Sequence, residues 1–74
     1  MQKTAQQIIE LMPNPSVEGS EVITRAFSYS QKAHEPQKRN SGEPYFNHVF
    51  EVACILARMN ADYATISAGL YQPL

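Results

Sequence analysis

The chain has 74 residues, a single cysteine and a formal net charge of −1, from six Lys and Arg against seven Asp and Glu. This length allows at most one small domain, and a single cysteine excludes an intramolecular disulfide. The charge gives no overall field that would attract nucleic acid or an anionic membrane, so we expect neither as a direct partner. The N-terminus lacks the apolar segment of a signal peptide, and no apolar run is as long as a membrane span.

Cys54 lies between Val52-Ala53 and Ile55-Leu56, where a cysteine is typically a small buried apolar residue. One thiol and two distant histidines do not have the spacing of a zinc finger. A free thiol suits a reducing compartment, and with the missing signal and span it predicts a cytoplasmic protein.

The first predicted helix covers residues 4–12, because apolar residues recur there on one face: Ala5, Ile8, Leu11 and Met12. Pro13-Asn14-Pro15 ends it, since each proline removes a donor and restricts the residue before it. We therefore take residues 1–19 as an N-terminal helix followed by a proline-rich turn. Either Ser16 or Ser20 can cap the next helix, and Glu21 beside Ser20 favours Ser20.

A second helix is predicted over residues 21–34, where the apolar pattern has a period near 3.6. One stripe holds Val22, Ala26, Tyr29 and Ala33, with Ile23, Phe27 and Ser30 beside it. Pro36 ends this helix, and a loop follows to Pro44 with Ser41-Gly42 as its turn.

A third helix is predicted from Tyr45 or Phe46 to about Met59, and Asn60 is a plausible end for it. Its broad apolar face holds Phe46, Val49, Phe50, Ala53, Leu56 and Ala57. Asp62 can cap a last helix that runs to Tyr71. No segment alternates like a strand, so the fold class is all-α with about four helices. Residues 20–74 then form an incomplete helical domain, because the apolar residues from Ala61 onward have nothing after them to pack against; we expect a truncation or a partner subunit.

The loop from Glu35 to Pro44 concentrates the polar chemistry of the chain. Lys38-Arg39 offers two adjacent cations, and an arginine fork can bind phosphate or stack on a base. His48 follows in the first turn of the third helix, where its imidazole can face the loop. A solvated loop with a structural histidine is the alternative, because the residues alone do not supply three metal ligands.

This part of the sequence resembles the opening of the HD-type hydrolase domain of RelA/SpoT homologues. Those proteins make and degrade the guanosine tetra- and pentaphosphate alarmones of the stringent response. The resemblance covers roughly residues 22–72, and it rests on Ala33-His34, Gln37, Arg39, Ser41-Gly42-Glu43-Pro44-Tyr45, His48, Val52-Ala53, Ile55-Leu56, Asp62 and Thr65.

The resemblance implies roles for four residues. His48 matches the family's first metal-ligating histidine, which holds manganese, and Arg39 matches the arginine that lies against the guanine base. Asn40 and Ser41 fall in the same nucleotide-contacting loop. A metal-activated water attacking the bond to the 3′-pyrophosphate is the chemistry that such a site would carry.

The chain departs from the family pattern at three places. Pro36 replaces a glycine, Asn40 stands where active members often carry a cation, and Gln72-Pro73 occupies the place of the His-Asp pair. Glutamine is a poor ligand for a divalent metal, proline has no side-chain ligand, and the family's later aspartate ligand is expected beyond Leu74. One of four expected ligands therefore remains in this sequence. We therefore expect no catalytic residues and no retained metal.

The resulting hypothesis is an N-terminal piece of a RelA/SpoT-type protein with a degenerate hydrolase module that serves structure or regulation. Its expected partners are a guanosine polyphosphate and either the synthetase domain of the parent, which transfers pyrophosphate from ATP to GTP or GDP, or another protein that covers the apolar face. Two alternatives stay open: a piece of an active metal-dependent hydrolase, and a free-standing helical interaction module.

Overall fold

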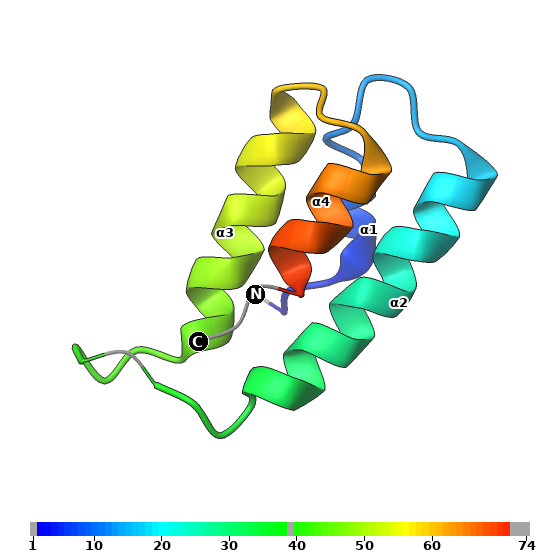
Figure 1. Ribbon diagram of the computed structural model, residues 1–74. Coiled ribbons are helices and arrows are strands. Elements are labelled where there is room, and N and C mark those ends of the chain that lie inside the picture. The colour runs from blue at the N-terminus through cyan, green and yellow to red at the C-terminus, as the bar shows by residue number, and fades with distance from the viewer. Residues whose placement is uncertain (1, 39, 72–74) are drawn as a thin grey trace.

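In residues 2–38 and 40–71, which the computed structural model describes, the chain forms four α-helices and no strand (Figure 1). They are α1 (Ala5–Ile9), α2 (Val17–His34), α3 (Tyr45–Arg58) and α4 (Tyr63–Leu70). The predicted all-α class and the predicted order of helices are confirmed.

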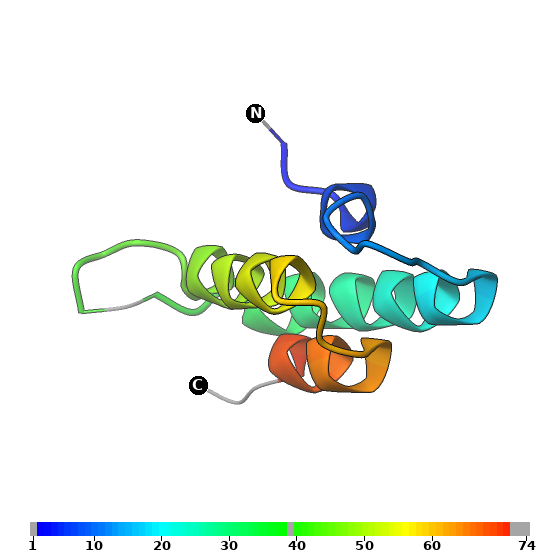
Figure 2. The ribbon, with the colours of Figure 1, turned by 90° about the horizontal axis from the view of Figure 1, so that it is seen from above.

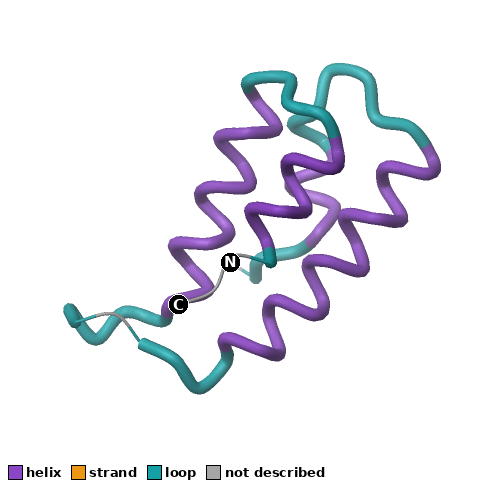
Figure 3. The backbone as a smooth tube through the Cα atoms, viewed as in Figure 1, coloured by secondary structure: helices purple, strands orange, loops and turns teal. Residues whose placement is uncertain are grey.

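Helices α2 and α3 lie side by side and run in opposite directions, with α1 on one side of this pair and α4 on the other (Figure 2). Helix α4 runs parallel to α2, since Gly19 lies against Tyr63 where both helices begin, and Tyr29 in the second half of α2 lies against Tyr71 at the end of α4. The loop between α2 and α3 is at one end of the bundle, and the other two connections are at the opposite end (Figure 3). The loop singled out by the sequence is thus separated from the other connections.

All four helices contribute to one apolar core. Phe27 of α2 meets Phe46 and Phe50 of α3 edge to face, with ring centroids 5.3 and 6.2 Å apart. Such geometry is favoured by the aromatic quadrupole. The other buried apolar residues are Ile8, Ile9, Ile23, Ala26, Tyr45, Val49, Ala53, Cys54, Ala57, Ile66 and Leu70.

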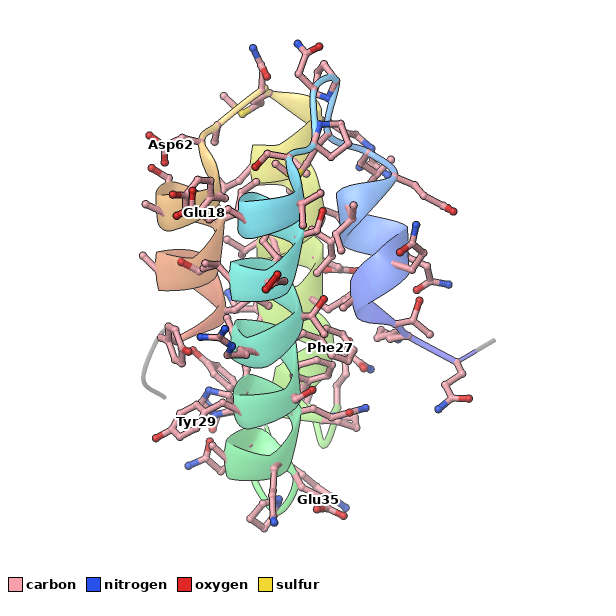
Figure 4. The ribbon with its side chains drawn as sticks, turned by 90° about the vertical axis from the view of Figure 1, so that its right-hand side faces the viewer. Glu18, Phe27, Tyr29, Glu35 and Asp62 are labelled. Carbon is pink, nitrogen blue, oxygen red and sulfur yellow. The ribbon has the colours of Figure 1, made fainter. Side chains whose placement is uncertain are left out.

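The apolar face of α2 is centred differently from the predicted stripe. Tyr29 is 61% exposed and Ala33 is exposed, whereas Ile23, Phe27 and Ser30 are buried. Figure 4 shows Phe27 and Tyr29 on opposite sides of α2. The predicted stripe is therefore wrong: it is displaced by about one residue from the buried face of α2. Both α1 and α3 pack on the side of Phe27, whereas Tyr29 lies over Tyr71 at the end of α4.

Helix α2 begins at Val17, four residues before the predicted start. The Ser16 hydroxyl accepts a hydrogen bond from the Gly19 backbone N–H at 2.9 Å, so Ser16 is the N-cap and the preference for Ser20 is wrong. Helix α1 is also shorter than predicted. It ends at Ile9, and a Thr4–Gln7 capping box begins it.

The predicted end of α3 and the predicted start of α4 are confirmed by their hydrogen bonds. Asn60 has a φ of 61°, and the N–H groups of Asn60 and Ala61 donate to the carbonyls of Ala57 and Leu56. These are the two bonds of a Schellman motif, and asparagine tolerates the left-handed conformation that the motif needs. The Asp62 carboxylate then accepts from the Thr65 N–H at 2.8 Å and begins α4.

Within the described ranges, none of the helices combines the length and the apolar character needed to cross a bilayer.

Candidate functional site

The loop between α2 and α3 extends away from the bundle (Figure 1). Helix α2 ends at His34 because Pro36 cannot continue it, and α3 begins directly after Pro44. Gly42 has a φ of 89°, a left-handed conformation that glycine adopts without strain, so the predicted Ser41-Gly42 turn is confirmed. Lys38, Asn40, Ser41 and Glu43 are exposed.

The base of the loop is closed by hydrogen bonds at Gln37. Its N–H donates to the His34 carbonyl, and its carbonyl accepts from the Tyr45 N–H, both at 3.0 Å. Lys38 and Pro44 form an isolated bridge beside them. The two ends of the loop are therefore held together, although the loop itself is exposed.

Two imidazoles flank the Tyr45 ring. The His34 ring lies edge to face with Tyr45 at 5.0 Å between centroids, and the His48 ring lies tilted to it at 5.9 Å. His34 and Tyr45 are buried, while His48 is half-buried. The Nδ1 of His34 also contacts Gln37 Oε1, so His34 links the end of α2 to the loop.

Of the predicted nucleotide contacts, Asn40 and Ser41 lie on the exposed part of the loop, and Arg39 lies outside the described residues. The Ser41 hydroxyl accepts a weak bond from the Glu43 N–H at 3.4 Å. The side chains of Lys38, Asn40 and Ser41 are accessible, so this side of the loop offers an ammonium, an amide and a hydroxyl to a ligand.

His48 was the predicted remnant of a metal site. In residues 2–38 and 40–71, no three His, Cys, Asp or Glu side chains are close enough together to hold a metal ion. A divalent metal needs at least three protein ligands of the right kind, so the described residues do not fit the manganese that the family resemblance implies. Gln72 and Pro73, at the place of the His-Asp pair, lie outside the described residues.

A hollow of about 540 Å³ lies next to the base of the loop, between the last turns of α2 and the first turn of α3. His34, Pro44 and the Phe46 ring line it together with Lys32 and Asn47. Sequence reasoning gave Lys32 and Asn47 no role, because nothing local marks two residues from different helices as neighbours. The volume is within the range of small-ligand pockets.

The sequence reasoning also missed the structural role of Gln37. Its position three residues after His34 is a signal for a contact at a helix end, since side chains at this spacing meet. The bond from the Tyr45 N–H to the Gln37 carbonyl carries no such local signal, because the two partners are eight positions apart along the chain.

The family model described as HD domain matches residues 26–74. Over 48 residues the chain is 50% identical to the bifunctional (p)ppGpp synthase/hydrolase SpoT of Escherichia coli K12, and the match covers 65% of this chain and 7% of that protein. It is 47% identical over 49 residues to the GTP pyrophosphokinase rsh of Brucella melitensis, covering 66% of this chain and 6% of that protein. The matched region is therefore under a tenth of the length of these curated relatives. No solved structure matches.

Proposed function

The chain belongs to the HD domain family, and from this premise we propose that it is part of the hydrolase-type module of a RelA/SpoT-type protein. We further propose that this module binds a guanosine nucleotide without hydrolysing it. The names of its relatives include a synthase/hydrolase of (p)ppGpp and a GTP pyrophosphokinase. The proposed ligand class is accordingly a guanosine phosphate of the stringent response, in the cytoplasm.

The observation that carries this proposal is the loop between α2 and α3. Its two ends are tied at Gln37 and Tyr45, and its exposed part presents Lys38, Asn40 and Ser41. A loop fixed at its base loses less conformational entropy when it binds a ligand than a free one does. Arg39 would add a planar cation that can stack on a guanine ring or pair with phosphate.

The absence of hydrolysis follows in this proposal from the ligand set around His48. The described residues do not complete a metal site, and the sequence has Gln72-Pro73 where the resemblance expects His-Asp. Without a metal-activated water, the loop has no nucleophile to direct at a pyrophosphate.

The proposed role of the module is then structural or regulatory, beside a synthetase domain that transfers pyrophosphate from ATP to GTP or GDP. Ile55 on α3 and Met59 directly after that helix are 51% and 71% exposed. Neighbouring exposed apolar side chains of this kind favour a protein surface that another domain or a partner covers.

Titration calorimetry with guanosine 3′,5′-bis(diphosphate) tests the nucleotide part of the proposal. We expect Arg39→Ala to weaken binding by about tenfold, because one cation–π or charged hydrogen bond contributes roughly 1–2 kcal/mol. Arg25→Ala is the matched control, since Arg25 is exposed on α2 beside α1 and far from the loop. Equal affinities of the wild type and Arg39→Ala would refute the nucleotide role.

The retained His48 favours one second candidate, an active metal-dependent hydrolase. The two candidates differ in manganese content. Metal analysis of the parent protein after dialysis should find no bound manganese if the module is degenerate, and one manganese per chain would establish the hydrolase candidate instead.

A further inference from the structure

We propose that Gln37, His34 and Tyr45 form a positioning unit that holds the loop of residues 38–44 and the His48 ring in place. The three residues are part of the sequence resemblance, yet neither the metal chemistry nor the nucleotide contacts give them a task. Their effect on nucleotide affinity rests on the proposed function, whereas their effect on the loop and on His48 does not.

Gln37 contacts both arms of the loop. Toward α2, its N–H donates to the His34 carbonyl at 3.0 Å, and its side-chain Oε1 is 2.5 Å from His34 Nδ1. Toward α3, its carbonyl accepts from the Tyr45 N–H at 3.0 Å. A single residue thus links the last residue of α2 to the first residue of α3.

The side-chain contact depends on where His34 carries its hydrogen. An amide oxygen only accepts, so the contact is a hydrogen bond in the tautomer that has the hydrogen on Nδ1 of His34. The link from Gln37 to His34 therefore needs both the acceptor on Gln37 and a hydrogen on Nδ1 of His34.

Tyr45 couples the position of the His34 ring to that of the His48 ring. The Tyr45 ring is only 9% exposed and lies edge to face on His34 at 5.0 Å. The same ring also lies against His48, at 5.9 Å between centroids. A ring packed in this way restricts the side-chain rotamers of its neighbours, so a shift of His34 changes the space open to the His48 imidazole.

The competing explanation is that Gln37 only makes a local contact at the end of α2 and has no effect on His48. Two substitutions distinguish this explanation from the proposal. Gln37→Met keeps the length of the side chain and removes the acceptor. Gln37→Glu keeps an acceptor for the His34 Nδ1–H. A role in packing alone would tolerate both equally, whereas positioning through His34 requires the acceptor.

Nuclear magnetic resonance of the full chain measures the effect directly. We expect Gln37→Met to speed the exchange of the Tyr45 amide hydrogen about fivefold, the factor that corresponds to one neutral hydrogen bond of about 1 kcal/mol. The side-chain resonances of His34 and His48 should shift as well. Gln37→Glu should restore the slow exchange, and Gln6→Met is the matched control, because Gln6 is exposed on α1 away from the loop.

Wild-type exchange at Tyr45 and unshifted His48 resonances in Gln37→Met would overturn the positioning unit. If Gln37→Met does not fold, His34→Phe gives the same comparison, because it keeps a ring against Tyr45 and removes the donor to Gln37. In that variant too, unchanged Tyr45 exchange would contradict the proposal.

Calorimetry with guanosine 3′,5′-bis(diphosphate) then measures the functional consequence. We expect Gln37→Met to weaken binding about threefold and Gln6→Met to leave it unchanged. Equal affinity in Gln37→Met and wild type would overturn the link from positioning to binding. No binding by the wild type would instead refute the proposed function, and the exchange and resonance measurements would still decide the positioning unit.

Discussion

The ionised side chain of Asp62 stabilises the start of α4. Its carboxylate accepts the Thr65 N–H at 2.8 Å at the positive end of α4. Hydrogen bonds from Thr65, mainly from its backbone, hold the pKa of Asp62 below its usual value. The ionised form is therefore favoured in the folded state relative to the unfolded chain.

The pH dependence of stability follows from the sign of this shift. Because the folded pKa is the lower one, the stabilisation is present above the unfolded pKa of about 3.9 and is lost as the pH falls through the folded value. We expect the wild type to lose stability relative to Asp62→Asn as the pH is lowered below about 4. Urea unfolding of both proteins at several pH values checks this, and a difference independent of pH would contradict it.

Cys54 illustrates a residue whose role follows from its neighbours in the sequence. It is 9% exposed, and this burial raises the pKa of its thiol above the ordinary value. A thiol that is both buried and protonated is a poor nucleophile, in agreement with its prediction as an apolar core residue.

At the scale of the helix, the start of α2 depends on which serine is the cap. Ser16 and Ser20 are four residues apart, and each is followed within two residues by one apolar and one acidic residue. The structure selects Ser16, whose hydroxyl accepts the Gly19 N–H, while Ser20 lies inside the first turns and its own N–H donates to the Ser16 carbonyl.

Replacing each serine separates the two positions. We expect Ser16→Ala to lower the free energy of unfolding by about 1 kcal/mol, the typical value of an N-cap. Ser20→Ala should change it little or raise it slightly, because alanine has the higher helix propensity. Denaturant unfolding of both variants checks this, and a larger loss for Ser20→Ala would place the helix start at Ser20 after all.

At the scale of the whole molecule, Gly19 lies where the start of α2 packs against the Tyr63 ring at the start of α4. A Cβ built at Gly19 would be 2.9 Å from Cδ2 of the Tyr63 ring and 2.9 Å from the Ser16 Oγ. Glycine inside a helix is unfavourable by propensity alone. Its use here is explained by a partner helix that is 44 residues away along the chain.

Gly19→Ala sets helix propensity against packing. Propensity predicts a gain of about 1 kcal/mol, whereas forcing an extra methyl into a packed contact typically costs roughly 1–3 kcal/mol. We expect a net loss of stability, because the Tyr63 ring and the Ser16 cap must both move. Thermal unfolding monitored by circular dichroism measures the sign, and Gly42→Ala is no substitute control because its φ is itself strained for alanine.

Features that depend on near neighbours along the chain were predictable from the sequence. The end of α3 at Asn60, the cap at Asp62, the turn at Gly42 and the apolar face of α3 all follow from local conformational preference or helical spacing. The family resemblance was likewise readable from a short string of residues, and the family match confirms it.

The remaining features required the tertiary structure, because they join residues that are distant in sequence. Which side of α2 is buried was decided by the helices packed on it, so Phe27 is inside and Tyr29 lies over Tyr71. The contact between Gly19 and Tyr63 has the same origin. At the loop, the sequence by itself determined that a polar segment with His34, Gln37 and His48 joins two helices. Only the fold brought Tyr45 against His34 and closed the loop through Gln37, since those contacts exist only once α2 and α3 lie side by side.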